Sequence, residues 1–307
     1  MKAKNILAAA VVAAMIIPAA CSKHNPEPDP LPEPEKPSLA EWHPEPVPED
    51  EIHYLSITGE AVYPEEPDDF GDVDFVSSTY ENGMGVMKFS GKLTEIGGIR
   101  TLRSTEFTAI KLPASVTFIG HYAFADNVLL EQFTVGPNVT TIQQNPFECC
   151  DGLKCFFGKY VSEDKRCIVV DGELKSFAPA GLTSYSVPNG VKRIGDSAFK
   201  RCLELEELTL PASVDFIATA AFLNCRGLKK LTMLGEVSEI GYIAFEYNHS
   251  LEEIYCKSAV PPAFEFNIAP SRSDVPALKA VYVPRGSVDA YKSKWAFVAD
   301  LIEGYDF

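Results

Sequence analysis

The sequence lacks the motifs that mark most enzymes and metal proteins. Its five histidines are scattered along 307 residues, and none of its eight cysteines forms a CxxC pair. It contains no serine nucleophile elbow, no phosphate-binding loop and no HExxH motif. The cysteine spacing of common zinc sites is also missing. We therefore expect a protein that is not an enzyme, with no catalytic residue, no metal site and no cofactor.

The chain is also poor in basic residues and in long apolar runs. It carries 43 acidic side chains against 27 lysines and arginines, for a formal net charge of −16. Binding to nucleic acid needs a basic face, so we expect no nucleic-acid partner. After residue 17, no apolar run approaches the roughly 20 residues of a transmembrane helix.

The first residues have the pattern of an export signal. Two lysines precede the apolar run 6–17, and Pro18-Ala19-Ala20-Cys21 follows it. A cysteine directly after Ala-Ala resembles a lipoprotein signal. This implies that residues 1–20 are removed and that a lipid on Cys21 anchors the protein to a membrane. Pro18 stands where such signals usually have leucine, so an ordinary signal peptide cut near Ala20 is the alternative.

Residues 21–50 combine proline with acidic side chains. From Ser22 to Asp50 the sequence has nine prolines, eight acidic residues and two lysines. This composition favours extended polyproline II and cannot form a core. At about 3.1 Å per residue, its reach is on the order of 90 Å. We expect a disordered stalk or tether between the membrane and a folded domain.

The remaining chain is organised by a repeat of 23 residues. Three consecutive copies begin at Leu182, Leu205 and Leu228, and each opens with the apolar triplet L-x-x-L-x-L or a close variant. The last two members of the triplet are two residues apart, the period of a strand, so they face the same side. A fixed period of this length predicts a solenoid of stacked coils, because no single copy can bury its apolar groups alone.

The same register predicts nine strands and the boundaries of the domain. They begin at Met84, Phe107, Leu130, Leu153, Leu182, Leu205, Leu228, Leu251 and Leu278. We expect a solenoid over residues 84–283, preceded by a β cap at 51–83 and followed by a cap at 284–307. The long interval after Leu153 contains Asp171-Gly172 between two apolar stretches, which predicts a β-hairpin at about 159–181 that projects from one edge. Helical spacing of Val288, Tyr291 and Trp295 predicts a C-terminal helix with Ser287 as its N-cap.

A second column of small side chains lies three residues after the phenylalanine of each copy. In a solenoid such a column stacks, and its side chains can bond backbone groups of the adjacent coil. It consists of Asn127, Cys150, Cys202, Cys225 and Asn248. This column and the triplet resemble leucine-rich repeats, and the signature LPASVxxIxxxAFxxCxxLxxL resembles the BspA-like subclass of bacterial surface proteins, over residues 84–307.

Three further features have both a chemical and a structural interpretation. Cys155 and Cys167 flank the inserted hairpin and could be bonded, although burial alone explains most of the cysteines. The acidic run 65–74 could bind calcium, but it lacks the ligand spacing of an EF-hand and also fits a solvated turn. Asp196-Ser197-Ala198 matches a short O-glycosylation acceptor motif of some Gram-negative gut bacteria, and equally fits the repeat turn.

The third and fifth residues of each triplet face away from the core and form the candidate ligand surface. Exposed aromatic side chains supply binding area at low entropic cost. We therefore expect a contact patch formed by Tyr255, Tyr282, Glu207, Lys230 and Glu253.

The resemblance implies non-catalytic recognition of, or adhesion to, an extracellular protein or glycan. The expected location is the outer membrane, as a lipoprotein on the surface of a Gram-negative bacterium. A carbohydrate- or nutrient-capture lipoprotein and a structural envelope protein are the alternatives.

Overall fold

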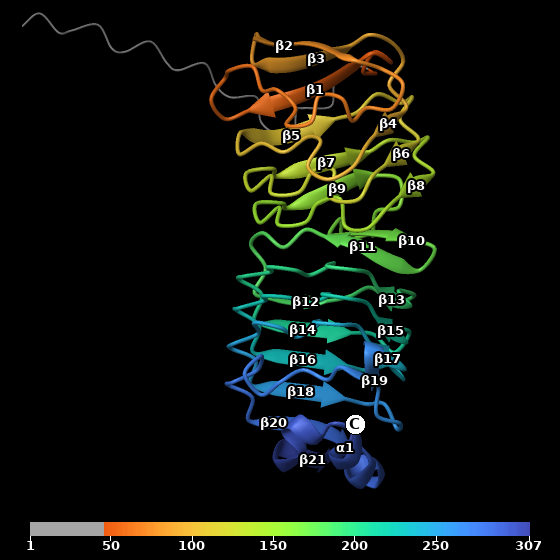
Figure 1. The fold of residues 1–307 in the computed structure, drawn as a ribbon, viewed down its shortest axis with the longest axis vertical. Helices are drawn as coiled ribbons and strands as arrows, with labels where there is room; N and C mark the ends of the chain where they lie inside the picture. The colour runs from red at the N-terminus through yellow and green to blue at the C-terminus, as the bar shows by residue number, and fades with distance from the viewer. Residues whose placement is uncertain (1–45) are drawn as a thin grey trace, which may run out of the picture. The chain divides into compact units, whose positions relative to one another are not determined.

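The fold was analysed in a computed structural model, which describes residues 46–307. In this part of the chain, coils stack on one another along the vertical axis of Figure 1, and most of them contribute two short strands. The expectations for residues 1–45, including the signal, Cys21 and most of the stalk, lie outside the described residues. Within residues 46–307, the structure contains no helix of the length and hydrophobicity that crossing a membrane requires.

The triplets form what we call the long-strand face. Most neighbouring strands on this face pair in parallel with a shift of 23 residues, as in Glu207 opposite Lys230, and the shift between β18 and β20 is 27 residues. The predicted repeat solenoid with short parallel strands is confirmed. Its strands are β5 (Phe107–Lys111), β7 (Gln132–Val135), β9 (Cys155–Gly158), β12 (Ser184–Ser186), β14 (Glu207–Leu210), β16 (Lys230–Met233), β18 (Glu253–Cys256) and β20 (Ala280–Pro284).

A second row of strands, the short-strand face, was not predicted. Each of its strands ends in a buried apolar residue, such as Ile194, Ile217 or Ile240. Its strands pair in parallel, with the same 23-residue shift from β13 to β15 and from β15 to β17. The core lies between the two faces, where Phe199, Phe222 and others stack coil on coil. The short-strand face comprises β4 (Glu95–Ile96), β6 (Phe118–Ile119), β8 (Thr141–Ile142), β13 (Arg193–Ile194), β15 (Phe216–Ile217), β17 (Glu239–Ile240) and β19 (Ala263–Phe264).

The predicted hairpin is present as β10 (Cys167–Val170) and β11 (Glu173–Phe177). Both turn residues, Asp171 and Gly172, have positive φ (51° and 80°), as a tight two-residue hairpin turn requires. The hairpin does not project from one edge as predicted, because β11 pairs in parallel with β13 and continues the short-strand face. The long-strand face is interrupted here: β9 pairs with β7, and β12 pairs with β14.

The N-terminal cap differs from the predicted ladder. β1 (Glu51–Ser56) lies between β3 (Met84–Phe89) and β5 and is antiparallel to both, and β2 (Phe75–Glu81) pairs with the outer side of β3. The prediction that the strand from Met84 opens the parallel ladder is therefore wrong. This arrangement places the buried Ile52 and Tyr54 of β1 over the first coil, whose apolar end would otherwise meet water.

The C-terminal cap contains the predicted helix, α1 (Val288–Lys294). Tyr291 and Trp295 are fully buried, and the Trp295 indole donates a hydrogen bond to the Pro262 carbonyl (3.2 Å). Ser287 occupies the N-cap position, but its hydroxyl donates to the Ala259 carbonyl (2.6 Å) and makes no capping bond. The predicted N-cap position is therefore confirmed, but the side chain does not cap the helix. The chain also has three short 3₁₀ segments: η1 (Glu265–Asn267) before β20, and η2 (Arg285–Ser287) and η3 (Ala296–Leu301) after it. The last strand, β21 (Ile302–Tyr305), was not predicted and pairs in parallel with β20.

Candidate functional site

The outward positions of β14, β16, β18 and β20 hold the predicted contact patch. Strand pairing places Lys230 between Glu207 and Glu253, so one base lies between two acids on neighbouring strands. The same register sets Tyr255 opposite Tyr282. The structure thus brings Lys230, Glu253 and the two tyrosines together, while Glu207 lies one strand further from the aromatic rings.

Three tyrosines form the centre of the site, and we call them the tyrosine cluster: Tyr255, Tyr282 and Tyr305. The first two rings are stacked, with centroids 4.5 Å apart and planes at 27°. Tyr305, from β21, lies 5.3 Å and 5.5 Å from them. Phe307 continues the cluster at 5.0 Å from Tyr305. Sequence reasoning missed these last two residues, because a four-residue strand after a helix carries almost no periodic signal.

Charged groups surround the rings. The Lys230 ammonium lies 4.8 Å from the centre of the Tyr255 ring, a cation–π geometry. The Tyr255 hydroxyl donates to Glu253 Oε2 (3.2 Å). Desolvation, followed by the bond to and charge of Glu253, raises the pKa of Tyr255 to about 12, so the phenol keeps its proton at neutral pH.

A shallow groove of about 320 Å³ runs beside the cluster. Its lining combines aromatic, aliphatic and charged groups: Lys230, Thr232, Leu234, Tyr255, Lys257, Tyr305, Asp306 and Phe307. Asp306 is paired with Arg285 (2.8 Å), and Lys230 and Lys257 are the basic groups of the groove lining. The arrangement can hold a ligand by packing, hydrogen bonds and charge, and the groove lining contains no serine, cysteine or histidine that could act as a nucleophile or base.

The stacking column is buried and bonds across coils. Cys150, Cys225 and Asn248 each donate to the carbonyl of the phenylalanine that lies 26 residues earlier, at 3.1, 2.8 and 2.8 Å. Asn127 makes three bonds: its Nδ2 donates to Leu102 O and Phe124 O, both at 2.7 Å, and its Oδ1 accepts from Ser104 N (2.7 Å). Cys202 is equally buried, in the coil that follows the inserted hairpin. The column therefore serves the stacking of coils and offers no surface to a ligand.

The remaining local features are used structurally. The seven cysteines of the described part are free thiols, so the alternative of a Cys155–Cys167 bond is not realised. In the acidic run, the Asp69 carboxylate accepts from Thr101 Oγ1 (2.8 Å) and from the Gly98 amide, and in doing so covers the first coil. Ser197 is only 4% exposed, which places its hydroxyl out of reach of a glycosylating enzyme in the folded protein.

Thiol reactivity is expected to be low throughout the fold. Burial raises the pKa of Cys149 and of Cys167 to about 12, and the thiolate is the reactive species. In a Cys21→Ser variant, which keeps only the seven cysteines of the described part, we expect labelling with DTNB at pH 8 to be roughly a hundredfold slower in the native protein than in guanidinium. Fast labelling of several thiols in the native state would contradict the burial of the column.

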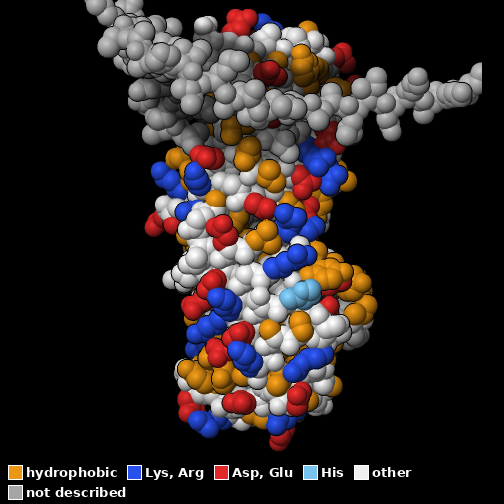
Figure 2. All heavy atoms as spheres, turned by 90° about the vertical axis from the view of Figure 1, so that its left-hand side faces the viewer, with side chains coloured by type: hydrophobic (Ala, Val, Ile, Leu, Met, Phe, Trp, Pro, Cys, Tyr) orange, Lys and Arg blue, Asp and Glu red, His pale blue; other side chains and the backbone are white. Residues whose placement is uncertain are grey.

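Charges on the visible surface are mixed. In the face shown in Figure 2, acidic and basic side chains are interspersed, with hydrophobic groups among them. The part of this face that is drawn in colour therefore shows no continuous basic stripe of the kind that follows a nucleic-acid backbone.

These features define the class of protein. A parallel stack of 23-residue coils with an L-x-x-L-x-L strand is the architecture of a leucine-rich repeat solenoid. The chain belongs to the family with the BspA type leucine-rich repeat region: the family model matches six copies over residues 80–162 and 173–265, more than half of the chain. The family expected from the sequence is confirmed. The unmatched gap between the two ranges coincides with the start of the inserted hairpin.

Solved structures with a similar fold come from several bacteria. A leucine-rich cell surface protein of Faecalibacterium prausnitzii shares 24% identity over 64% of this chain and 53% of its own, with a TM-score of 0.48. A leucine-rich repeat protein of Eubacterium ventriosum shares 20% over 59% and 52% (TM-score 0.44), and one of Bacteroides ovatus shares 19% over 65% and 66% (TM-score 0.33). The chain thus spans about half the length of the first two. Among curated proteins, no sequence matches the chain.

Proposed function

We propose that the protein is a non-catalytic recognition protein at the outside of the cell, which binds an extracellular protein through the tyrosine cluster and the adjoining groove. The observation that carries this proposal is the meeting of three tyrosines and Phe307 on the outward side of the last strands. Aromatic side chains that are clustered and flanked by charges are typical of interface hot spots. Membership in a family of repeat proteins without a catalytic motif agrees with a binding role.

The geometry of the rings favours a protein over a sugar as the ligand. Tyr255 and Tyr282 turn their faces toward each other, and Lys230 lies over the remaining face of Tyr255. A sugar ring stacks on an open aromatic face, whereas a protein side chain can use ring edges, hydroxyls and lysines. Tyr305 and Phe307 are 41% and 42% exposed, so they are the rings that a glycan would use. We therefore keep a glycan as the second candidate ligand, bound through Tyr305 and Phe307.

The proposal extends to location. We infer an outer-membrane lipoprotein that is anchored by Cys21 and displays the solenoid on a Pro/acidic stalk, because a binding surface of this kind serves a cell only where its ligand can reach it. Protease treatment of intact cells tests this. The wild-type protein should fractionate with membranes and be cleaved from outside, and a Cys21→Ala variant should lose the membrane association. If the wild-type protein on intact cells is protected from protease, the proposal of recognition at the cell surface is wrong, and a periplasmic role takes its place.

Binding to arrays of extracellular host proteins and of glycans tests the site itself. We expect a double variant Tyr255→Ala/Tyr282→Ala to bind at least about tenfold more weakly, because truncating one hot-spot aromatic residue costs roughly 2 kcal/mol or more. The matched control is Tyr63→Ala/Tyr247→Ala, which removes two tyrosines that are 60% and 49% exposed elsewhere. Equal loss in both double variants, or no loss in the first, would refute the tyrosine cluster as the site.

A further inference from the structure

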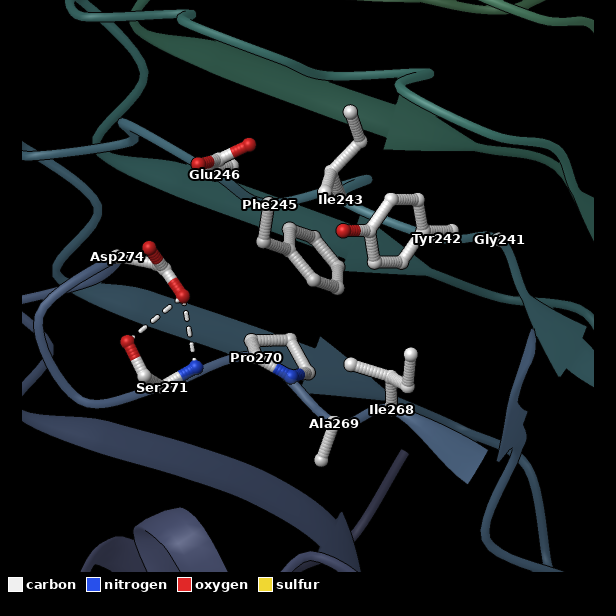
Figure 3. A pocket seen from close by; sticks show the side chains of 10 residues that line it. All are labelled: Gly241, Tyr242, Ile243, Phe245, Glu246, Ile268, Ala269, Pro270, Ser271 and Asp274. Carbon is white, nitrogen blue, oxygen red and sulfur yellow. Dashed lines mark hydrogen bonds between the residues drawn. The ribbon is translucent and has the colours of Figure 1, made fainter. Parts of the chain in front are cut away.

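A small pocket lies where the last regular coil meets the loop inserted after β19. One wall is the turn 241–246 and the other is the loop 268–274 (Figure 3). Its volume is about 210 Å³. Pockets for drug-sized ligands start at about 300 Å³, so this one suits a single side chain.

Hydrogen bonds fix the segment that leads into the loop and the loop itself. The Glu265 carboxylate accepts hydrogen bonds from the Tyr242 amide and from Thr219 Oγ1, both at 2.8 Å. In the loop, the Asp274 carboxylate accepts from the amide and the hydroxyl of Ser271, at 2.7 and 2.8 Å. These bonds hold the pocket open and orient the Asp274 carboxylate without neutralising its charge, because serine donors are neutral.

The lining divides into an acidic side and an apolar side. Figure 3 shows the carboxylates of Glu246 and Asp274 on one side, Tyr242 and Ile268 on the other, and the Phe245 ring between them. Among the residues described, no lysine or arginine lines this pocket. The arginine nearest to Asp274 in sequence, Arg272, pairs with Asp300 (3.6 Å) instead.

The rim of the pocket exposes unusually large apolar groups. Tyr242 is 39% exposed, Ile268 52% and Phe266 73%. The Phe266 ring lies 6.3 Å from that of Tyr242, at an edge-to-face angle of 69°. Phe266 also has a positive φ of 54°, a conformation that a bulky residue rarely adopts. An apolar rim around a pocket is the surface that a protein partner covers when it excludes water from a central anchor.

We propose that this pocket receives an arginine side chain of a protein partner. The aliphatic stem of arginine packs against Phe245 and Ile268, as long cationic side chains do along apolar surface. Its guanidinium presents five donors in a planar fork to the two carboxylates. This site is separate from the tyrosine cluster and takes a ligand group of opposite charge to the one that the two groove lysines favour.

Methyl NMR of the full chain tests the proposal directly, because two isoleucines line the pocket. We would label isoleucine δ1-methyl groups and titrate with N-acetyl-arginine amide, using N-acetyl-citrulline amide as the uncharged probe of equal shape. The methyl signals of Ile243 and Ile268 are expected to shift saturably with the arginine probe, while that of the buried Ile194 stays in place. Equal shifts with the citrulline probe, or no shifts with either, would overturn the proposal.

Variants separate this site from the tyrosine cluster. Glu246→Gln removes one charge at nearly constant shape and should weaken the arginine probe at least about tenfold, because a charge-assisted hydrogen bond is lost. Glu204→Gln, a change at an exposed acid elsewhere, should leave the affinity unchanged. The Tyr255→Ala/Tyr282→Ala variant should also bind the probe normally, so failure of one site does not imply failure of the other. Unchanged affinity in Glu246→Gln would rule out the pocket.

Discussion

Replacing Phe222 by alanine is expected to lower the free energy of unfolding by about 4 kcal/mol, within the range measured for phenylalanine truncation in cores. Phe222 is fully buried in the middle of the column of stacked rings, 5.9 Å from Phe199 and 5.8 Å from Phe245. Each coil of a solenoid contacts only its neighbours, so no distant packing can close the cavity. Urea unfolding followed by circular dichroism measures the effect as a lower midpoint.

The control for this prediction is Leu203→Ala. Leu203 lies in the turn two residues before Leu205 and is 41% exposed, so its truncation should change the free energy of unfolding by less than about 1 kcal/mol. Should Phe222→Ala not fold, Phe222→Leu should still fold and lose roughly 1–2 kcal/mol. A loss in Phe222→Ala no larger than in Leu203→Ala would show that the ring column does not hold the stack together.

Most of the fold could be predicted from the repeat period, because in a solenoid the period determines both where the strands lie in the sequence and which strands pair. Residues 23 apart must lie side by side, so the register of β14, β16 and β18 follows from reading the sequence alone. The pairing of β1 with β3 and β5 follows no such rule. Its partners are antiparallel and distant in sequence, and the stretch from Met84 satisfies the apolar pattern of the triplet whether its neighbour is β1 or β5. Periodicity can state which side chains face inward, but not which strand is inserted between two others.

The same distinction applies to the candidate site. Tyr255 and Tyr282 could be placed on one face, because the strand period fixes the direction of both side chains and the register aligns them. Tyr305 reaches the cluster only because α1 and η3 turn the chain back to add β21 beside β20. The pocket between the turn 241–246 and the loop 268–274 depends on the path of an inserted loop. The 27-residue interval from Leu251 to Leu278 predicts that a loop is inserted, but not which path it takes.

The column of small residues provides the second large effect. Asn127→Ala is expected to lower the free energy of unfolding by about 3 kcal/mol. Asn127 is fully buried, and alanine would leave Leu102 O and Ser104 N without their bonding partner. A buried backbone group that loses its only partner costs roughly 1–3 kcal/mol. The measurement is again the midpoint of urea unfolding.

Asn248→Ala is the matched control, because Asn248 has the same residue type, the same repeat position and the same full burial. Its Nδ2 makes a cross-coil bond to Phe222 O (2.8 Å), and its Oδ1 is buried without a hydrogen-bond partner in the described part of the chain. The two asparagine oxygens differ because of the residue 23 positions earlier in the chain. The Ser104 amide donates to Asn127 Oδ1, whereas the corresponding amide of Cys225 donates to Phe222 O within its own turn and does not reach Asn248. Alanine at 248 removes one bond and also removes an unsatisfied oxygen, so we expect a loss of only about 1 kcal/mol. Equal losses at both positions would mean that cavity formation, and not cross-coil hydrogen bonding, sets the contribution of this column to stability.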